Sequence, residues 1–97
     1  TGDYTQQLPG KLSAAILFPP AGDLVEGILA QLKRGGRLVL SPVAMTPLTI
    51  RDYNHIWLER SIISLANITR QDGREFLDIA QREKIKSRFE TFGFDDL

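Results

Sequence analysis

The sequence contains no cysteine and a single histidine, His55. A zinc site of three or four Cys or His ligands therefore cannot be built from this chain, and disulfides are excluded. No hydroxyl has a histidine and a carboxylate at motif spacing, so a hydrolase triad has no support. We interpret His55 as a packed or surface residue and Asp95-Asp96 as solvated carboxylates. The chain is thus predicted to hold no catalytic residue and no metal ligand.

The sequence also lacks an excess of either charge, because twelve basic and twelve acidic residues are interspersed over 97 residues. This balance argues against nucleic acid or an anionic membrane as a partner. No apolar run approaches the roughly 20 residues of a membrane span, and no stretch resembles a signal peptide. With the missing cysteines, this fits a cytoplasmic protein. Because the chain starts at Thr1 without an initiator Met and ends in mid-pattern, we expect it to be part of something longer.

What the sequence does contain is a strand, helix and strand pattern over residues 11–41. Residues 12–18 are a short apolar run, typical of a parallel strand that is covered on both faces. Apolar residues then recur at helical spacing, with Asp23 predicted to cap the helix and Glu26 to reach back. We expect Lys33 and Arg34 in the last helical turn and Gly35 as its left-handed stop. Residues 37–40 resume extended structure.

The rest of the chain repeats this alternation. Residues 1–10 and 42–48 are predicted to be loops. A Thr49/Asp52 capping box predicts a short helix to about residue 58, with Ile50, Tyr53, Ile56 and Trp57 facing inward. Residues 61–66 are a third apolar strand. A Thr69/Asp72 capping box then predicts a helix to about residue 83, and residues 86–92 alternate as a strand would. The predicted buried side of this last helix consists of Phe76, Leu77, Ile79 and Ala80.

These elements predict an α/β fold, namely half of a Rossmann-type doubly wound sheet. Its three parallel strands would be joined by crossover helices and followed by a C-terminal strand. In such sheets ligands gather at the carboxyl ends of the strands, here Phe18-Pro19, Leu40-Ser41 and Leu65-Ala66-Asn67. Two structural alternatives stay open. The turn Pro19–Gly22 leads into a helix and could bind an anion, or Gly22 could simply be a structural glycine. Asn67 could be only a turn residue.

Four pieces, in order along the chain, carry a resemblance to a known family. They are Ala15-Ile-Leu-Phe-x-Pro-x-Gly22, Leu32-x-x-Gly-Gly-Arg-Leu-Val-Leu40, Leu58-Glu-Arg-Ser61 followed by Ile62-Ile63, and Thr69-Arg-x-Asp-Gly-Arg-Glu-Phe76. Together they resemble the zinc-dependent alcohol dehydrogenases of the medium-chain dehydrogenase superfamily. The resemblance implies one partial domain over residues 1–97. Within it, residues 11–85 would be the second half of a Rossmann-like NAD(P)-binding domain, and residues 86–97 the return toward a catalytic domain.

The same resemblance implies a nicotinamide cofactor, NAD or NADP, with zinc in the parent protein and no zinc ligand in this chain. Leu40, Ser41, Leu65, Ala66 and Asn67 match positions whose backbone lines the nicotinamide carboxamide pocket. Pro20 and Gly22 match the rim of the adenosine side. Ser41-Pro42 replaces a glycine that often follows this strand in the family. The parent would oxidise alcohols or reduce aldehydes, whereas the chain alone would be inactive.

Two further expectations concern association. An uncovered apolar edge at residues 12–18 would recruit another chain, and in the family the strand matching residues 61–66 pairs with its twin. We therefore expect a homo-oligomer formed through sheet edges. The rival interpretation is a non-enzymatic half-Rossmann association module. A flavodoxin-like or response-regulator domain would need acidic clusters at the strand ends, which the sequence lacks.

Overall fold

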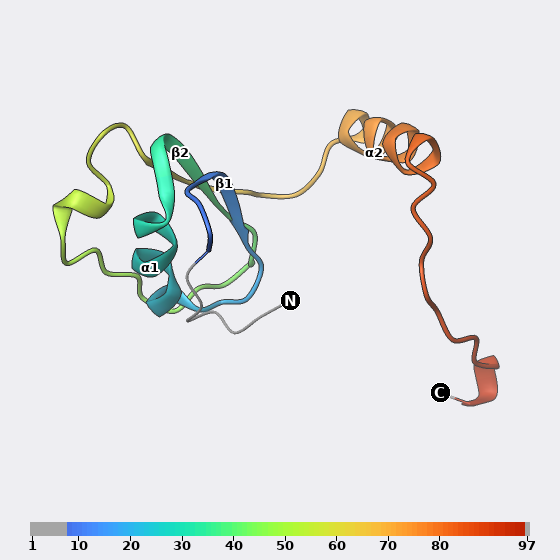
Figure 1. The fold of residues 1–97 in the computed structure, drawn as a ribbon. Coiled ribbons are helices and arrows are strands. Elements are labelled where there is room, and N and C mark those ends of the chain that lie inside the picture. Colours follow the sequence, from blue (N-terminus) through green and yellow to red (C-terminus); the bar gives the residue numbers. More distant parts are fainter. Residues whose placement is uncertain (1–7, 97) are drawn as a thin grey trace. The chain divides into compact units, whose positions relative to one another are not determined.

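The computed structural model describes residues 8–96, and the chain divides after Ala66 into two compact units (Figure 1). The predicted loop at residues 1–10 therefore lies mostly outside the described residues, as does Leu97. The first unit contains β1 (Leu12–Leu17), the 3-10 turn η1 (Gly22–Leu24), α1 (Val25–Ala30), β2 (Leu32–Leu40), the 3-10 turn η2 (Tyr53–His55) and β3 (Ser61–Ser64). The second unit contains α2 (Arg70–Arg82) and the 3-10 turn η3 (Phe94–Asp96).

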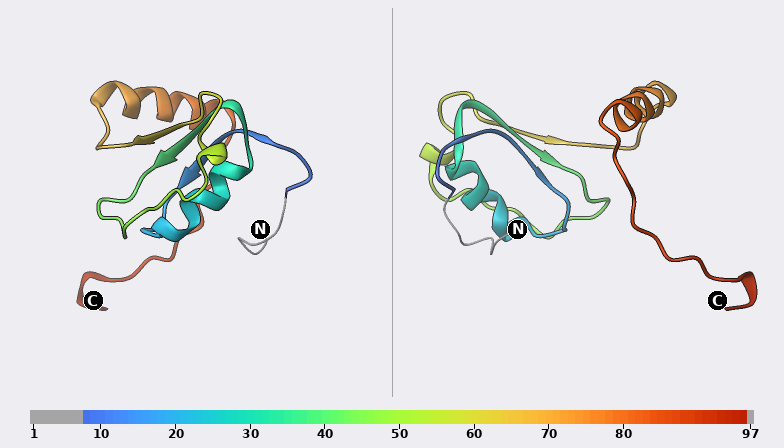
Figure 2. Two further views of the ribbon diagram at one scale, coloured as in Figure 1. Left: turned by 90° about the vertical axis from the view of Figure 1, so that its left-hand side faces the viewer. Right: turned by 45° about the vertical axis from the view of Figure 1, so that its right-hand side comes forward.

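The first unit is built on one three-stranded sheet in the order β1-β2-β3, and both pairs of strands are parallel. Figure 2 shows the strands from two further sides. Ile16, Val39 and Ile63 are register partners across the sheet. The connection from β1 to β2 runs through α1, which is the crossover that a parallel pair requires. The α/β fold with three parallel strands in one open sheet is thereby confirmed.

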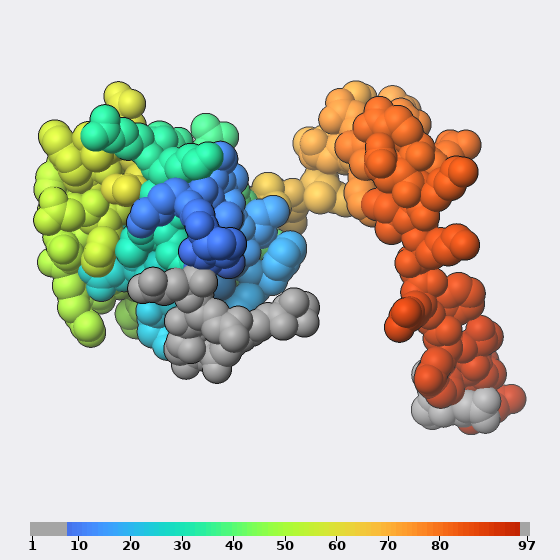
Figure 3. Space-filling model, viewed as in Figure 1, coloured from blue at the N-terminus to red at the C-terminus, as the bar shows by residue number. Residues whose placement is uncertain are grey.

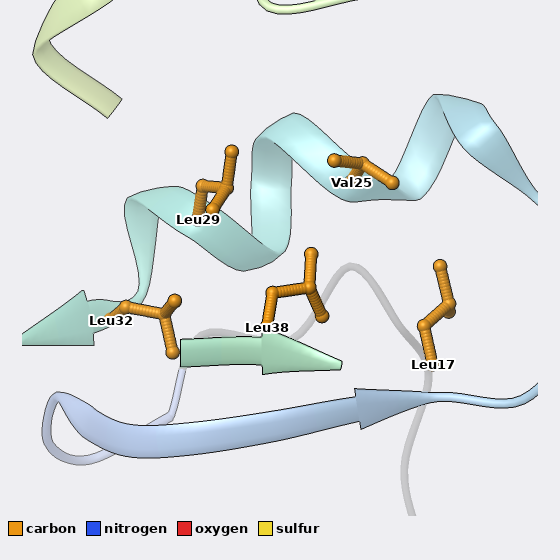
Figure 4. Close-up of a cluster of buried hydrophobic side chains, with 5 residues drawn as sticks. All are labelled: Leu17, Val25, Leu29, Leu32 and Leu38. Carbon is orange, nitrogen blue, oxygen red and sulfur yellow. The ribbon is translucent and has the colours of Figure 1, made fainter. Parts of the chain in front are cut away.

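The core of this unit is a small cluster between α1 and the sheet (Figure 4). It consists of Leu17, Val25, Leu29, Leu32 and Leu38. Burying each of these side chains contributes about 1.5–3 kcal/mol to the stability of the unit. Ile16 is 58% exposed. The expectation that β1 is covered on both faces is therefore wrong for the described part of the first unit.

The end of α1 differs from the prediction. The helix stops at Ala30 and β2 already begins at Leu32, so Lys33 and Arg34 belong to the strand. No side chain caps η1 or α1, which makes the predicted Asp23 cap wrong. The physical reason for the early stop is that Leu32 is fully buried and pairs with Leu12.

A bulge follows in β2. Between the pairs Leu12–Leu32 and Ala14–Arg37, β1 advances two residues and β2 advances five. Gly35 lies within this bulge at a φ of 66°, a left-handed conformation that glycine adopts without strain. The left-handed glycine predicted from the sequence is therefore present, but it bends a strand rather than ending a helix.

Residues 42–60 connect β2 to β3 with little regular structure. The predicted Thr49/Asp52 capping box and its helix are wrong, since only the turn η2 forms. Asp52 is itself the cap, and its Oδ1 accepts a hydrogen bond from the Asn54 amide at 2.9 Å. Figure 3 shows this segment, green to yellow, packed against the rest of the first unit. Long-range contacts described below, and not helical propensity, fix its path.

In the second unit the Thr69/Asp72 capping box of α2 is confirmed, because both of its reciprocal hydrogen bonds form. Three of the residues predicted to be buried on α2 are exposed, namely Phe76, Leu77 and Ile79. No strand forms at residues 86–92, so that prediction is wrong. A lone strand needs a partner for its backbone groups, and residues 67–96 contain no other strand.

Over residues 8–96 no helix has the length and apolar character that crossing a bilayer requires.

Candidate functional site

The carboxyl ends of the three strands meet at one edge of the sheet. Leu17 is the register partner of Leu40, and Leu40 is the partner of Ser64. The ladder continues one residue further, because the Ser41 amide donates to the Leu17 carbonyl at 3.0 Å and the Leu65 amide donates to the Leu40 carbonyl at 2.8 Å. We call Leu40, Ser41, Leu65 and Ala66 the carboxyl edge. The structure thus brings together four of the seven residues expected to contact a cofactor.

The carboxyl edge is open to solvent to differing degrees. Leu40 and Ser41 are half-buried, whereas Leu65 is 53% exposed and Ala66 is also exposed. None of these four side chains is ionisable, and only Ser41 carries a polar group. Such an edge can position a ligand through backbone groups and shape, but it supplies no acid, base or nucleophile.

The turn at Pro20 and Gly22 is occupied by another part of the same unit. The Gly22 amide donates to Thr46 Oγ1 at 2.7 Å, and the Thr46 hydroxyl donates to the Pro20 carbonyl at 3.2 Å. Gly22 is buried, and a Cβ there would lie 2.4 Å from the Pro47 carbonyl oxygen. This geometry favours the structural interpretation of Gly22, because its amide already has a partner and its missing side chain admits the loop. No sequence pattern indicated the Thr46 contact.

Asn67 begins the second unit and has a φ of 60°. Asparagine tolerates this left-handed conformation better than most residues, since its short side chain can bond locally. The conformation fits the turn interpretation of Asn67. Its role toward a cofactor stays a prediction.

Glu26 carries the main polar contact of the first unit, and sequence reasoning missed it. Its Oε1 accepts hydrogen bonds from the amides of Arg51 at 2.8 Å and Asp52 at 2.9 Å, and lies 3.2 Å from His55 Nδ1. The pKa of Glu26 is lowered, first by the Asp52 amide and then by the His55 side chain. Glu26 thus fastens the connection 42–60 to α1 instead of completing a cap. His55 is half-buried, and its contact is with the Glu26 carboxylate, which fits its interpretation as a packed or surface residue.

Arg60 fastens the end of the same connection. Its Nε donates to the Leu32 carbonyl at 3.1 Å, and its Nη1 donates to the carbonyls of Asn54 and Trp57 at 3.0 and 2.9 Å. A planar guanidinium with several donors is well suited to gathering carbonyl groups in this way. Arg60 therefore has a structural role that its sequence position did not reveal.

Over residues 8–96 no group of three His, Cys, Asp or Glu side chains is arranged to hold a metal ion. The acidic pair that was singled out from the sequence, Asp95 and Asp96, belongs to η3.

Comparisons with known proteins give one informative similarity. The chain is 40% identical over 85 residues to a protein of Mycobacterium tuberculosis named "probable alcohol dehydrogenase AdhA". The aligned region covers 87% of this chain but only 25% of the mycobacterial protein, so the chain spans about a quarter of that relative. No family model matches the chain, and no solved structure matches it significantly. Over most of its length, the chain is thus similar to a section of an alcohol dehydrogenase-like protein.

Proposed function

We propose that this chain is the cofactor-binding part of an oxidoreductase that transfers hydride between an alcohol or aldehyde and a nicotinamide cofactor. The observation that carries the proposal is the 40% identity to a protein named as a probable alcohol dehydrogenase, over 85 residues. The parallel sheet supports it, because such sheets bind ligands at the carboxyl ends of their strands. NAD and NADP are both compatible with the proposal. We also propose that the parent protein is cytoplasmic.

Within this proposal the carboxyl edge orients the nicotinamide ring. The backbone of Leu40, Ser41, Leu65 and Ala66, together with Asn67, would line the pocket of the carboxamide group. Hydride transfer is the chemistry that the cofactor supplies when bound, and the protein contributes orientation and exclusion of water. The turn at Pro20 and Gly22 would shape the adenosine rim through its contact with Thr46, not through a free amide.

Zinc does not fit the described part of the chain, since residues 8–96 contain no cluster of three candidate ligands. We propose that any zinc of the parent protein is held by residues outside this chain. The medium-chain, zinc-dependent type is thus proposed on the sequence resemblance alone. It follows that the 97-residue chain should have no alcohol dehydrogenase activity of its own and weak or no affinity for a dinucleotide.

The coding sequence upstream of Thr1 tests the oxidoreductase proposal. A G-x-G-x-x-G turn and a Cys/His ligand set are expected there, since they would anchor the pyrophosphate and the zinc. The protein expressed from the longer frame should oxidise simple alcohols with NAD or NADP, whereas the 97-residue chain should not. A longer frame without both motifs and without activity would contradict the proposal. Turnover by the short chain would contradict our assignment of its role.

For association, we propose a homo-oligomer formed through the sheet edges at β1 and β3. Each of these strands has one neighbour in the sheet, so its outer edge can recruit a strand from another copy. The alternative function, a non-enzymatic half-Rossmann association module, rests on this same feature. Light scattering at high protein concentration should give a mass above that of the monomer, and a monomer would remove both ideas.

A further inference from the structure

A pocket lies at the end of the strands opposite the carboxyl edge. Its volume is about 530 Å³, and the residues that line it are Arg34, Tyr53, Ile56, Trp57, Leu58 and Glu59. Arg34 lies near the start of β2, and Glu59 lies two residues before the start of β3. This pocket is thus at the amino ends of the strands, whereas the proposed cofactor edge is at their carboxyl ends. Its volume is in the range of about 300–1,000 Å³ that small-molecule sites occupy.

Two aromatic rings contribute to the apolar surface of the pocket, beside Ile56 and Leu58. The ring centroids of Tyr53 and Trp57 are 6.2 Å apart and the ring planes are tilted by 49°. Tyr53 is 70% exposed and Trp57 is 50% exposed, so both rings can be contacted from solvent. Rings with this geometry offer a face and an edge to a third aromatic ring. The pocket is therefore suited to an aromatic ligand.

Two charges of opposite sign complete the lining. Arg34 supplies a guanidinium and Glu59 supplies a carboxylate, and both residues are exposed. The two ion pairs formed among residues 8–96 are His55–Glu26 and Arg82–Glu83, so neither Arg34 nor Glu59 is neutralised by a described residue. A ligand that carries both a carboxylate and an ammonium group would pair with both charges.

The backbone holds this arrangement in place at a cost in strain. Leu58 and Glu59 are consecutive non-glycine residues in the left-handed region, with φ of 68° and 62°. The Leu58 carbonyl accepts from the Gly35 amide at 2.9 Å, and the Trp57 carbonyl accepts from Arg60 at 2.9 Å. Strained residues fixed in this way gather at binding sites, where a preorganised site loses less entropy when a ligand binds.

We propose that this pocket binds a small aromatic zwitterion, a molecule of the aromatic amino acid class. Its ring contacts Tyr53 and Trp57, its carboxylate pairs with Arg34, and its ammonium group pairs with Glu59. This inference goes beyond the proposed function and does not depend on it.

Titration of the 97-residue chain with L-phenylalanine tests the proposal, because Trp57 is the single tryptophan of the sequence and its fluorescence reports on the pocket. We expect a saturable change with a dissociation constant in the low millimolar range, given the size of the probe. Phenylpropionate lacks the ammonium group and phenylethylamine lacks the carboxylate. Each should bind about two- to fivefold more weakly, the contribution of one exposed ion pair.

Two variants assign the charges. Arg34→Gln should weaken phenylalanine and phenylpropionate but leave phenylethylamine unchanged, whereas Glu59→Gln should weaken phenylalanine and phenylethylamine only. Arg37→Gln is the matched control, since Arg37 is an exposed arginine of β2 that does not line the pocket. Unfolding curves of the variants confirm that each is folded.

Three results would overturn the proposal. The first is no saturable change at concentrations tenfold above the expected dissociation constant. The second is equal binding of all three probes, or equal loss of all three in either charge variant. The third is a Trp57 signal that changes with protein concentration and not with the probe, which would assign this surface to a contact between two copies of the chain.

Discussion

The carboxylate of Glu26 accepts a hydrogen bond from the amide of Asp52 at 2.9 Å, across 26 residues of sequence. The same oxygen accepts from the Arg51 amide, so one side chain of α1 holds the middle of the connection 42–60. Replacing Glu26 with Ala should lower the melting temperature by several degrees, because two amides lose their acceptor. Glu26→Gln keeps an acceptor oxygen and should lower it less. Thermal unfolding followed by circular dichroism measures both, and equal stability of all three proteins would contradict this role of Glu26.

The same contact predicts how stability depends on pH. The pKa of Glu26 is below its ordinary value of 4.5 in the folded protein, so the folded state binds fewer protons than the unfolded state near that pH. The stabilisation from Glu26 is therefore complete above pH 4.5 and is lost as the pH falls through the lowered pKa. Asp52 and Asp72 act in the same direction, since hydrogen bonds from Asn54 and Thr69 lower their pKa values.

Denaturant unfolding at a series of pH values from about 7 to 3 should show this acid-side loss. The free energy of unfolding of Glu26→Gln should fall less steeply with decreasing pH, because one of the carboxylates responsible for the loss is absent. A variant curve parallel to that of the unsubstituted chain would show that Glu26 does not contribute.

Gly22 should be intolerant of any side chain. A Cβ at Gly22 would lie 2.4 Å from the Pro47 carbonyl oxygen, so Gly22→Ala must displace the loop at Thr46 and Pro47. Overpacking of this kind costs about 1–3 kcal/mol of folding free energy. Gly27→Ala is the matched control in α1, because nothing lies within 4 Å of its Cβ position and alanine favours a helix by up to about 1 kcal/mol. The denaturant concentration at the midpoint of unfolding should therefore fall for Gly22→Ala and rise for Gly27→Ala.

The left-handed backbone at Glu59 predicts a stabilising substitution. Its φ of 62° strains any residue with a Cβ, and its side chain is exposed, so Glu59→Gly removes strain without removing packing. We expect a gain of about 0.5–1 kcal/mol in the free energy of unfolding, after the entropy cost of glycine is included. Glu59→Ala is the control, since it keeps the strain. If both variants have the same stability, the left-handed strain is absent in solution.

Local sequence signals predicted the sheet and one helix well. Apolar runs at residues 12–18, 37–40 and 61–66 predicted the three strands, and the helical spacing between the first two predicted that this pair is parallel. The Thr69/Asp72 spacing gave the start of α2, because a capping box involves only groups three residues apart. The carboxyl edge at Leu40, Ser41 and Leu65 could be predicted because parallel strands end at the same edge of a sheet.

What the sequence could not reveal depends on contacts between distant residues. The signals at Asp23 and Glu26 predicted a cap, yet Glu26 binds amides 25 and 26 residues away and no cap forms. Likewise, Leu32 pairs with Leu12 in the sheet, which ends α1 before Lys33. The cover over Gly22 comes from Thr46, a loop residue whose sequence surroundings carry no pattern.

The proposed cofactor edge requires three strands that run in the same direction, so that their carboxyl ends meet. Nuclear Overhauser effects across the sheet of the 97-residue chain test this most directly. We predict cross-strand contacts from the backbone of Val39 to Ile16 on one side and to Ile63 on the other, together with contacts from Leu40 to Leu17 and Ser64. Cross-strand contacts in an antiparallel register, with Leu40 near Leu12 or Ser61, would contradict the fold and the cofactor edge built on it.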